Sequence, residues 1–189
     1  HLDLKVNDAV RPAGFHVRAV SQIQTPGFFV YRPVKPPGLG LLVLPGGGST
    51  SEGGDRGGRE IARYFADRGI ISFVLRYRLP GEGWKNREWV PLQDAQRAMR
   101  LIRAGEYGAG KLGVIGFSAG GHLSATLAIR SGMATYDALT PADRGSARPD
   151  IAAHMYPVIT MGEGAHQGSR DKLLGPSPTP QAVADWSLE

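Results

Sequence analysis

The sequence of 189 residues contains no cysteine. This excludes a disulfide framework, a thiol nucleophile, an iron–sulfur cluster and cysteine-ligated zinc. No apolar run approaches the roughly 20 residues that span a bilayer, so no membrane-spanning helix is predicted. HExxH, calcium-loop and paired-histidine patterns are also missing, and Gly108 to Gly113 fits G-x-G-x-x-G but precedes a strand instead of following one. We therefore expect no metal and no cofactor.

Blocks of like charge are also missing. Lys and Arg number 22 against 17 Asp and Glu, and the formal charge is +5. The basic residues are scattered among acidic ones, as in Asp55-Arg56, and the densest group, Arg97, Arg100 and Arg103, has the spacing of a solvated helix face. A mild positive charge affects solubility and steering and does not define a binding fold. We expect no nucleic-acid partner.

The chain begins at His1, and no basic-then-apolar leader follows it, so no signal peptide is expected in this chain. This leaves both a cytoplasmic and a secreted location open. Apolar residues make up 41% and charged residues 21%, which is an ordinary globular balance. The length favours one domain over residues 1–189.

Strand patterns alternate with helix patterns along the chain. Strands are predicted at residues 15–23, 28–31, 41–44, 70–74, 112–115 and 151–159. Helices are predicted at 60–68, from Pro91 to about 102, at 118–130 and, briefly, near 181–186, with the rest of the chain after Met161 as loop. This alternation predicts an α/β fold with a mostly parallel sheet and helices on both faces.

The segment Gly116-Phe117-Ser118-Ala119-Gly120 has the pattern G-x-S-x-G between a buried strand and a helix. In an α/β-hydrolase this pattern is the nucleophile elbow, a strained turn that exposes the serine hydroxyl above the sheet. The two glycines are needed because side chains there would collide with the neighbouring strand and helix. Ser118 is therefore the candidate nucleophile, and the N–H of Ala119 is a candidate donor to an oxyanion.

A second pattern, Leu44-Pro45-Gly46-Gly47-Gly48, follows a buried strand. Lipases and esterases use a glycine-rich loop at this place to supply further oxyanion N–H groups, because bare main-chain amides can approach a substrate carbonyl. Gly47 and Gly48 are the candidate donors. A triple glycine by itself would be read as a flexible loop, and the elbow downstream favours the oxyanion interpretation.

Several runs together resemble one family, the acetylxylan-esterase-like branch of the α/β-hydrolase esterases and lipases. The runs are residues 43–48 (VLPGGG), 76–80 (RYRLP), 91–98 (PLQDAQRA), 116–123 (GFSAGGHL), 156–158 (YPV) and 169–175 (SRDKLLG). The resemblance implies a carboxylic-ester hydrolase, often acting on acetyl groups of plant polysaccharides, with Ser118 as nucleophile. The chain departs from the pattern at Pro45, where related lipases have His, and at Ser49, where this branch often has an aromatic residue.

A serine hydrolase also needs a base and an acid, and in this fold the chain order is Ser, then Asp or Glu, then His. The resemblance places both after strands that would follow residues 156–158, so we expect them beyond Glu189 and the fold to be C-terminally incomplete. His122 is expected to be a packing residue and His154 a core residue of a buried strand. His166 lies near Asp171, but in the reverse order for a base and its acid.

The sequence thus predicts a serine carboxylesterase that forms an acyl-enzyme on short acyl or acetyl esters, such as those of plant polysaccharides. Two alternatives stay open: a catalytically inactive hydrolase-fold protein used for binding or assembly, and a peptidase of the same fold. An incomplete sheet would expose an edge, so association into a homo-oligomer through that edge is a further expectation. The acyl group and the alcohol are not specified by the sequence.

Overall fold

The computed structural model describes residues 5–10, 16–35, 38–49, 52–53, 55–105 and 107–189. At its centre is a five-stranded sheet with the strand order β3-β6-β4-β7-β8. Its members are β3 (Gly27–Tyr31), β4 (Leu39–Leu44), β6 (Ile70–Arg76), β7 (Lys111–Phe117) and β8 (Ile151–Met155). Only β3 is antiparallel to its neighbour, and the other pairs are parallel. The predicted mostly parallel sheet is confirmed.

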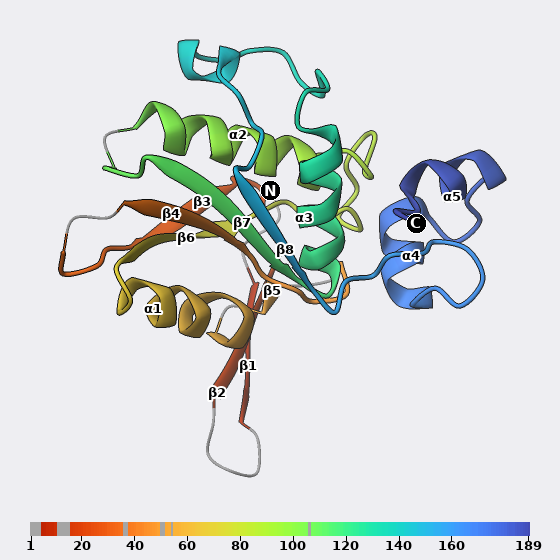
Figure 1. Ribbon diagram of the computed structural model, residues 1–189. Helices are drawn as coiled ribbons and strands as arrows, with labels where there is room; N and C mark the ends of the chain where they lie inside the picture. Colours follow the sequence, from red (N-terminus) through yellow and green to blue (C-terminus); the bar gives the residue numbers. More distant parts are fainter. Residues whose placement is uncertain (1–4, 11–15, 36–37, 50–51, 54, 106) are drawn as a thin grey trace.

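Helices cover both faces of this sheet, as predicted (Figure 1). A short π-helix (Asp55–Arg59) leads into α1 (Glu60–Ala66) on one face, and α2 (Val90–Ala104) and α3 (Ala119–Arg130) lie on the other. The central strand β4 serves both layers: Leu42 and Leu44 belong to the core under α2 and α3, whereas Leu41 and Val43 pack with α1. Burial on both sides explains why β4 is apolar throughout.

A second, smaller sheet is antiparallel and contains β1 (Lys5–Val10), β2 (His16–Ser21) and β5 (Glu52–Gly53). The predicted early strands at 15–23 and 28–31 therefore exist as β2 and β3 but lie in different sheets; residue 15 itself lies outside the described residues. The chain leaves β2 at Gln22, whose φ is 59°. The carboxylate of Glu82 holds this bend by accepting the backbone N–H groups of Gln22 and Ile23.

The prediction of a solvated face for the arginines of α2 holds only in part, because Arg103 is exposed whereas Arg97 and Arg100 are half-buried and all three have partners. The connection between α3 and β8, which includes the 3₁₀ turn Pro141–Arg144, crosses α2 and is held by them. Arg97 lies 3.4 Å from a carboxylate oxygen of Asp143, and Arg103 lies 2.9 Å from one of Asp150. Arg100 donates to a backbone carbonyl of the same connection at 3.0 Å. Helical spacing of charges cannot show which distant segment covers them.

The last strand, β8, pairs with β7, and within the described ranges no strand lies along its other side. Its large side chains are accordingly exposed, with Ile151 64% accessible. His154 is also exposed, which corrects the expectation of a core histidine. Among the described helices, none combines the length and the apolar character needed to cross a membrane.

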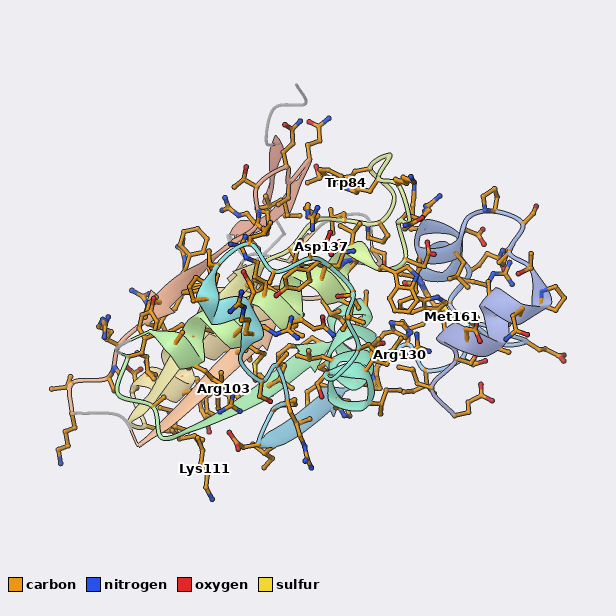
Figure 2. The ribbon with its side chains drawn as sticks, turned by 90° about the horizontal axis from the view of Figure 1, so that it is seen from above. Trp84, Arg103, Lys111, Arg130, Asp137 and Met161 are labelled. Carbon is orange, nitrogen blue, oxygen red and sulfur yellow. The ribbon has the colours of Figure 1, made fainter. Side chains whose placement is uncertain are left out.

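Beyond β8 the chain forms two helices, α4 (Gln167–Leu174) and α5 (Pro180–Trp186), which lie together beside α3 (Figure 1). The short C-terminal helix was predicted, but α4 was taken as loop. Met161, Leu173 and Trp186 form the core of this unit. Figure 2 shows Arg130 of α3 at its boundary, where the guanidinium lies 4.8 Å from the ring centroid of Trp186.

One buried ion pair ties the end of β6 to the start of α2. The carboxylate of Asp94 accepts the backbone N–H of Arg78 at 2.8 Å and its guanidinium at 2.6–3.1 Å, and Asp94 is only 5% exposed. The pair joins two of the runs that carry the family resemblance, residues 76–80 and 91–98. Their residue types are therefore explained by a structural contact between them.

We expect Asp94→Ala to lower the free energy of unfolding by about 2–4 kcal/mol, because it leaves a backbone N–H and a partly buried guanidinium without their acceptor. Urea unfolding monitored by circular dichroism measures this. Asp137→Ala, at an exposed aspartate, is the control and should change the value by less than about 0.5 kcal/mol. Equal effects of the two substitutions would show that the pair does not stabilise the fold.

Candidate active site

Ser118 stands at a sharp turn between β7 and α3. Its backbone has φ 53° and ψ −115°, a conformation that costs a non-glycine residue free energy. The surrounding main chain imposes it: the N–H of Ser118 donates to the carbonyl of Met155 at 3.0 Å, and its carbonyl accepts from His122 at 3.0 Å and from Val158 at 3.3 Å. The side chain is half-buried and lines a cavity. This is the strained, accessible turn that the motif predicts.

The two motif glycines are required by close approaches of the main chain. A Cβ at Gly116 would lie 2.0 Å from the carbonyl oxygen of Gly120, and a Cβ at Gly120 would lie 2.2 Å from that of Leu44. Contacts this short are not tolerated by backbone atoms, which cannot rotate away. The absence of side chains thus lets β7, α3 and β4 meet at the elbow, for the reason the sequence suggested.

We expect Gly120→Ala to destabilise the fold by about 3 kcal/mol or more, because the new methyl group overlaps the carbonyl of Leu44. Gly132→Ala is the matched control, since a Cβ there meets nothing within 4 Å. Chemical denaturation of both variants gives the comparison. A Gly120→Ala variant as stable as the Gly132→Ala variant would mean that the elbow is not packed as described.

The glycine loop after β4 rests directly on this turn. A Cβ at Gly46 would lie 2.6 Å from the carbonyl oxygen of Phe117, so the two main chains are in contact. The hydroxyl of Tyr77 donates to the carbonyl of Pro45 at 2.7 Å and fixes the start of the loop. Gly47 and Gly48 follow with positive φ values of 152° and 61°. The structure therefore places both candidate oxyanion donors in a loop that contacts the elbow.

Ala119 is the first residue of α3. The first N–H groups of a helix have no acceptor within the helix, and the helix dipole places partial positive charge there. The structure thus places Ser118 and Ala119 at the carboxyl end of β7, and Gly47 and Gly48 in the loop after β4, which contacts the elbow through Gly46. This arrangement can supply a hydroxyl nucleophile and main-chain donors to a developing negative charge.

The cavity beside Ser118 has a volume of about 430 Å³. Residues 156–160 form one wall, and Gly164, Ala165 and His166 form another. Among the described ranges, no cluster of three or more His, Cys, Asp or Glu side chains has a geometry that could hold a metal ion. The groups available around Ser118 are hydroxyls, an imidazole, an aromatic ring and main-chain amides.

None of the three downstream histidines hydrogen-bonds to the Ser118 hydroxyl in the described part of the chain. The Nε2 of His122 is buried and lies 2.9 Å from the carbonyl of Trp186, which makes it a packing residue as expected. The Nδ1 of His154 lies 2.8 Å from Ser124 Oγ. His166 lines the same cavity as Ser118, although the order of His166 and Asp171 in the chain did not favour it as a site residue. The described residues thus hold the nucleophile without a base in contact with it.

Burial lowers the pKa of His122 from its ordinary value of 6.5 to about 4. At a pH between these two values, His122 is protonated in the unfolded chain but not in the folded chain. The free energy of unfolding therefore decreases as the pH falls from about 6.5 to about 4. We expect this to remove about 3 kcal/mol from the free energy of unfolding. A His122→Gln variant should show a correspondingly flatter pH dependence in urea unfolding at pH 7 to 4.5, and identical slopes for both proteins would contradict the assignment.

The relation between His166 and α4 was not found from the sequence. His166 is the N-cap of α4, and its side chain accepts the backbone N–H of Ser169. The sequence signals for this helix lie at its C-terminal end, where Leu173 and Leu174 precede Gly175. Gly175 ends the helix with a φ of 96°. A histidine is not among the usual capping residues, so the start of the helix had no recognisable signature.

No family model matches the chain. Among curated proteins it is 37% identical over 156 residues to endo-1,4-beta-xylanase B of Butyrivibrio fibrisolvens, a match that covers 79% of this chain and 24% of that protein. It is 28% identical over 166 residues to an acetylxylan esterase of Xylanibacter ruminicola, covering 84% of this chain and 31% of the relative.

Similar solved structures are also hydrolases and esterases by name. An acetyl ester-xyloside bifunctional hydrolase from Caldicellulosiruptor lactoaceticus superposes with a TM-score of 0.74 at 34% identity, over 94% of this chain and 62% of the other. A thermophilic esterase from Thermogutta terrifontis with propionate bound gives a TM-score of 0.61 at 25% identity, over 95% and 64% of the two chains.

The sheet, the elbow and these likenesses define an α/β-hydrolase. Within that class, the chain is acetylxylan-esterase-like, as the sequence runs indicated. It spans about a quarter to a third of the length of the curated relatives and 62% of the bifunctional hydrolase.

Proposed function

We propose that this chain carries the nucleophile and the oxyanion site of a serine carboxylesterase. The observation that carries the proposal is the backbone of Ser118, held at φ 53° and ψ −115° so that its hydroxyl lines an open cavity. A conformation of this cost persists only where the surrounding structure imposes it, and such sites cluster at functional positions. Two of the similar proteins, one curated and one of known structure, are esterases by name.

In the proposed reaction Ser118 Oγ adds to the carbonyl carbon of an ester, and the hydroxyl proton passes to a general base. The carbonyl oxygen becomes an oxyanion that accepts hydrogen bonds from the N–H groups of Ala119 and of Gly47 or Gly48. Collapse of the intermediate breaks the ester C–O bond, and the alcohol leaves with the proton. Water then adds to the acyl-enzyme in the same way and releases the carboxylic acid. Each oxyanion donor contributes about 10²–10³ in rate.

The base in this fold is a histidine oriented by a carboxylate that precedes it in the chain. We propose that it is supplied from outside the described residues. His122 is buried against Trp186. His154, on the outer strand β8, hydrogen-bonds to Ser124 of α3. The proposal is consistent with the share of the solved hydrolase that this chain spans, 62%.

The substrates that we propose are short acyl esters, in particular acetyl esters of plant polysaccharides. The support is chemical and comparative. A cavity of about 430 Å³ beside Ser118 has room for a sugar ring, and its lining includes hydroxyl, imidazole and phenol groups. One relative is named an acetylxylan esterase and another an acetyl ester-xyloside hydrolase.

The test is hydrolysis of 4-nitrophenyl acetate by a protein in which this chain is joined to the segment that supplies the proposed base, with and without Ser118→Ala. We expect the substitution to lower kcat/KM by about 10³-fold or more, because the nucleophile is lost while the fold is kept. Ser146→Ala, at an exposed serine on the α3–β8 connection, is the control and should leave the rate unchanged. Full activity in the Ser118→Ala variant would refute the proposed nucleophile.

A second function is favoured by one observation. In the described part of the chain the Ser118 hydroxyl has no hydrogen-bond partner, so no general base among these residues is in place to take its proton. A hydrolase-fold protein without turnover would bind an ester or a sugar in the same cavity. Binding of an acetylated sugar with no detectable hydrolysis, even when the chain is joined to the segment proposed to supply the base, would favour this function over the esterase.

A further inference from the structure

We propose that His166 is a substrate-binding residue that donates a hydrogen bond from Nε2–H to the sugar part of the ester bound beside Ser118. This inference rests on the proposed function, because it assigns the alcohol side of the same site. His166 and Ser118 line one cavity, and they come from segments 48 residues apart. The sequence alone gave no reason to place them together.

The hydrogen bonds of the imidazole fix where its proton lies. Nδ1 accepts the backbone N–H of Ser169 at 3.2 Å, a donor that it shares with the carbonyl of His166 at 3.0 Å. The hydroxyl of Ser169 lies 2.9 Å from the same nitrogen. When Nδ1 accepts this N–H it carries no proton, and the neutral ring then has its hydrogen on Nε2; we assign this tautomer to His166. The remaining nitrogen of the ring is therefore a donor.

This tautomer also separates His166 from the role of general base. A base must offer a lone pair to the serine hydroxyl, and Nε2 of this ring offers a hydrogen instead. A hydrogen-bond donor suits an ether or hydroxyl oxygen of a sugar. The ring can thus bind the alcohol portion of an ester while a different group takes the serine proton.

The ring is held on a fixed support. Ser169 is 2% exposed, and a Cβ at Gly48 would lie 3.9 Å from its hydroxyl oxygen, so the start of α4 adjoins the oxyanion loop. At the far end of the helix Arg87 donates to the carbonyl of Asp171 at 3.3 Å. The same helix therefore sets the distance between the imidazole and the proposed oxyanion donors.

Other groups in the cavity fit a sugar as well. Tyr156 is 72% exposed beside Ser118 and presents an aromatic ring on which the C–H face of a pyranose can pack. The hydroxyl of Thr160 accepts the N–H of Gly162 at 3.0 Å and keeps its own hydrogen for a ligand oxygen. An aromatic face with hydroxyl and imidazole donors is a set of groups that recognises a polyol more readily than an alkyl alcohol.

The experiment compares two substitutions that separate binding from capping. His166→Asn keeps an acceptor for the N–H of Ser169, because asparagine is a good N-cap, and removes the distal donor. His166→Gln keeps an amide N–H near the position of Nε2 and weakens the cap. Both are made in a Ser118→Ala background, and binding of methyl 2-O-acetyl-β-D-xylopyranoside is followed by NMR titration.

We expect His166→Asn to weaken binding of this xyloside by about 10-fold, the effect of one lost hydrogen bond, and His166→Gln to weaken it by less than about 3-fold. The melting temperature should change in the opposite order, with His166→Gln less stable than His166→Asn because glutamine caps the helix less well. Equal loss in both variants, or a loss that follows stability, would show that His166 only caps α4. No binding in the Ser118→Ala background would overturn the sugar assignment, whereas hydrolysis of 4-nitrophenyl acetate by the unsubstituted chain joined to the segment proposed to supply the base reports on the esterase separately.

Discussion

The architecture depends on a close approach of three main chains at one point. Gly46, Gly116 and Gly120 let β4, β7 and α3 meet with backbone atoms in contact, and a Cβ at any of the three would lie 2.6 Å or less from a carbonyl oxygen. This contact sets both the angle of the helix that follows Ser118 and the position of the glycine loop. Hydroxyl and candidate oxyanion donors are therefore placed by the same packing constraint.

Much of the remaining structure keeps this point rigid. Tyr77 fixes the carbonyl of Pro45, and the buried pair of Arg78 and Asp94 anchors the segment that carries Tyr77 to α2. On the other side, the end of β8 accepts the N–H of Ser118. Two of the runs that carry the family resemblance, residues 76–80 and 91–98, thus have a structural explanation. They hold the glycine loop and α2 in place beside the elbow.

The sequence predicted what local patterns determine. G-x-S-x-G with its flanking apolar strand located the elbow, and the wholly apolar β4 indicated a sheet covered on both faces. The failures involve long-range partners: the ion pairs and hydrogen bonds of the arginines at 97, 100 and 103 were missed because nothing local reveals the connection that crosses them. His154 was expected to be buried because its strand pattern is apolar, but that strand is the last of the described sheet and has a neighbour on one side. α4 was missed because its cap is a histidine, and the cavity shared by Ser118 and His166 depends on that helix.

The central claim is that Ser118 presents its hydroxyl to an oxyanion site made of main-chain amides. A crystal structure of the chain after reaction with paraoxon tests it most directly, because the phosphoryl group mimics the tetrahedral intermediate. The account predicts a covalent bond to Ser118 Oγ, with a phosphoryl oxygen about 3 Å from the N–H of Ala119 and from that of Gly47 or Gly48. A phosphoryl group on another side chain, or one on Ser118 whose oxygen points away from these amides, would contradict it.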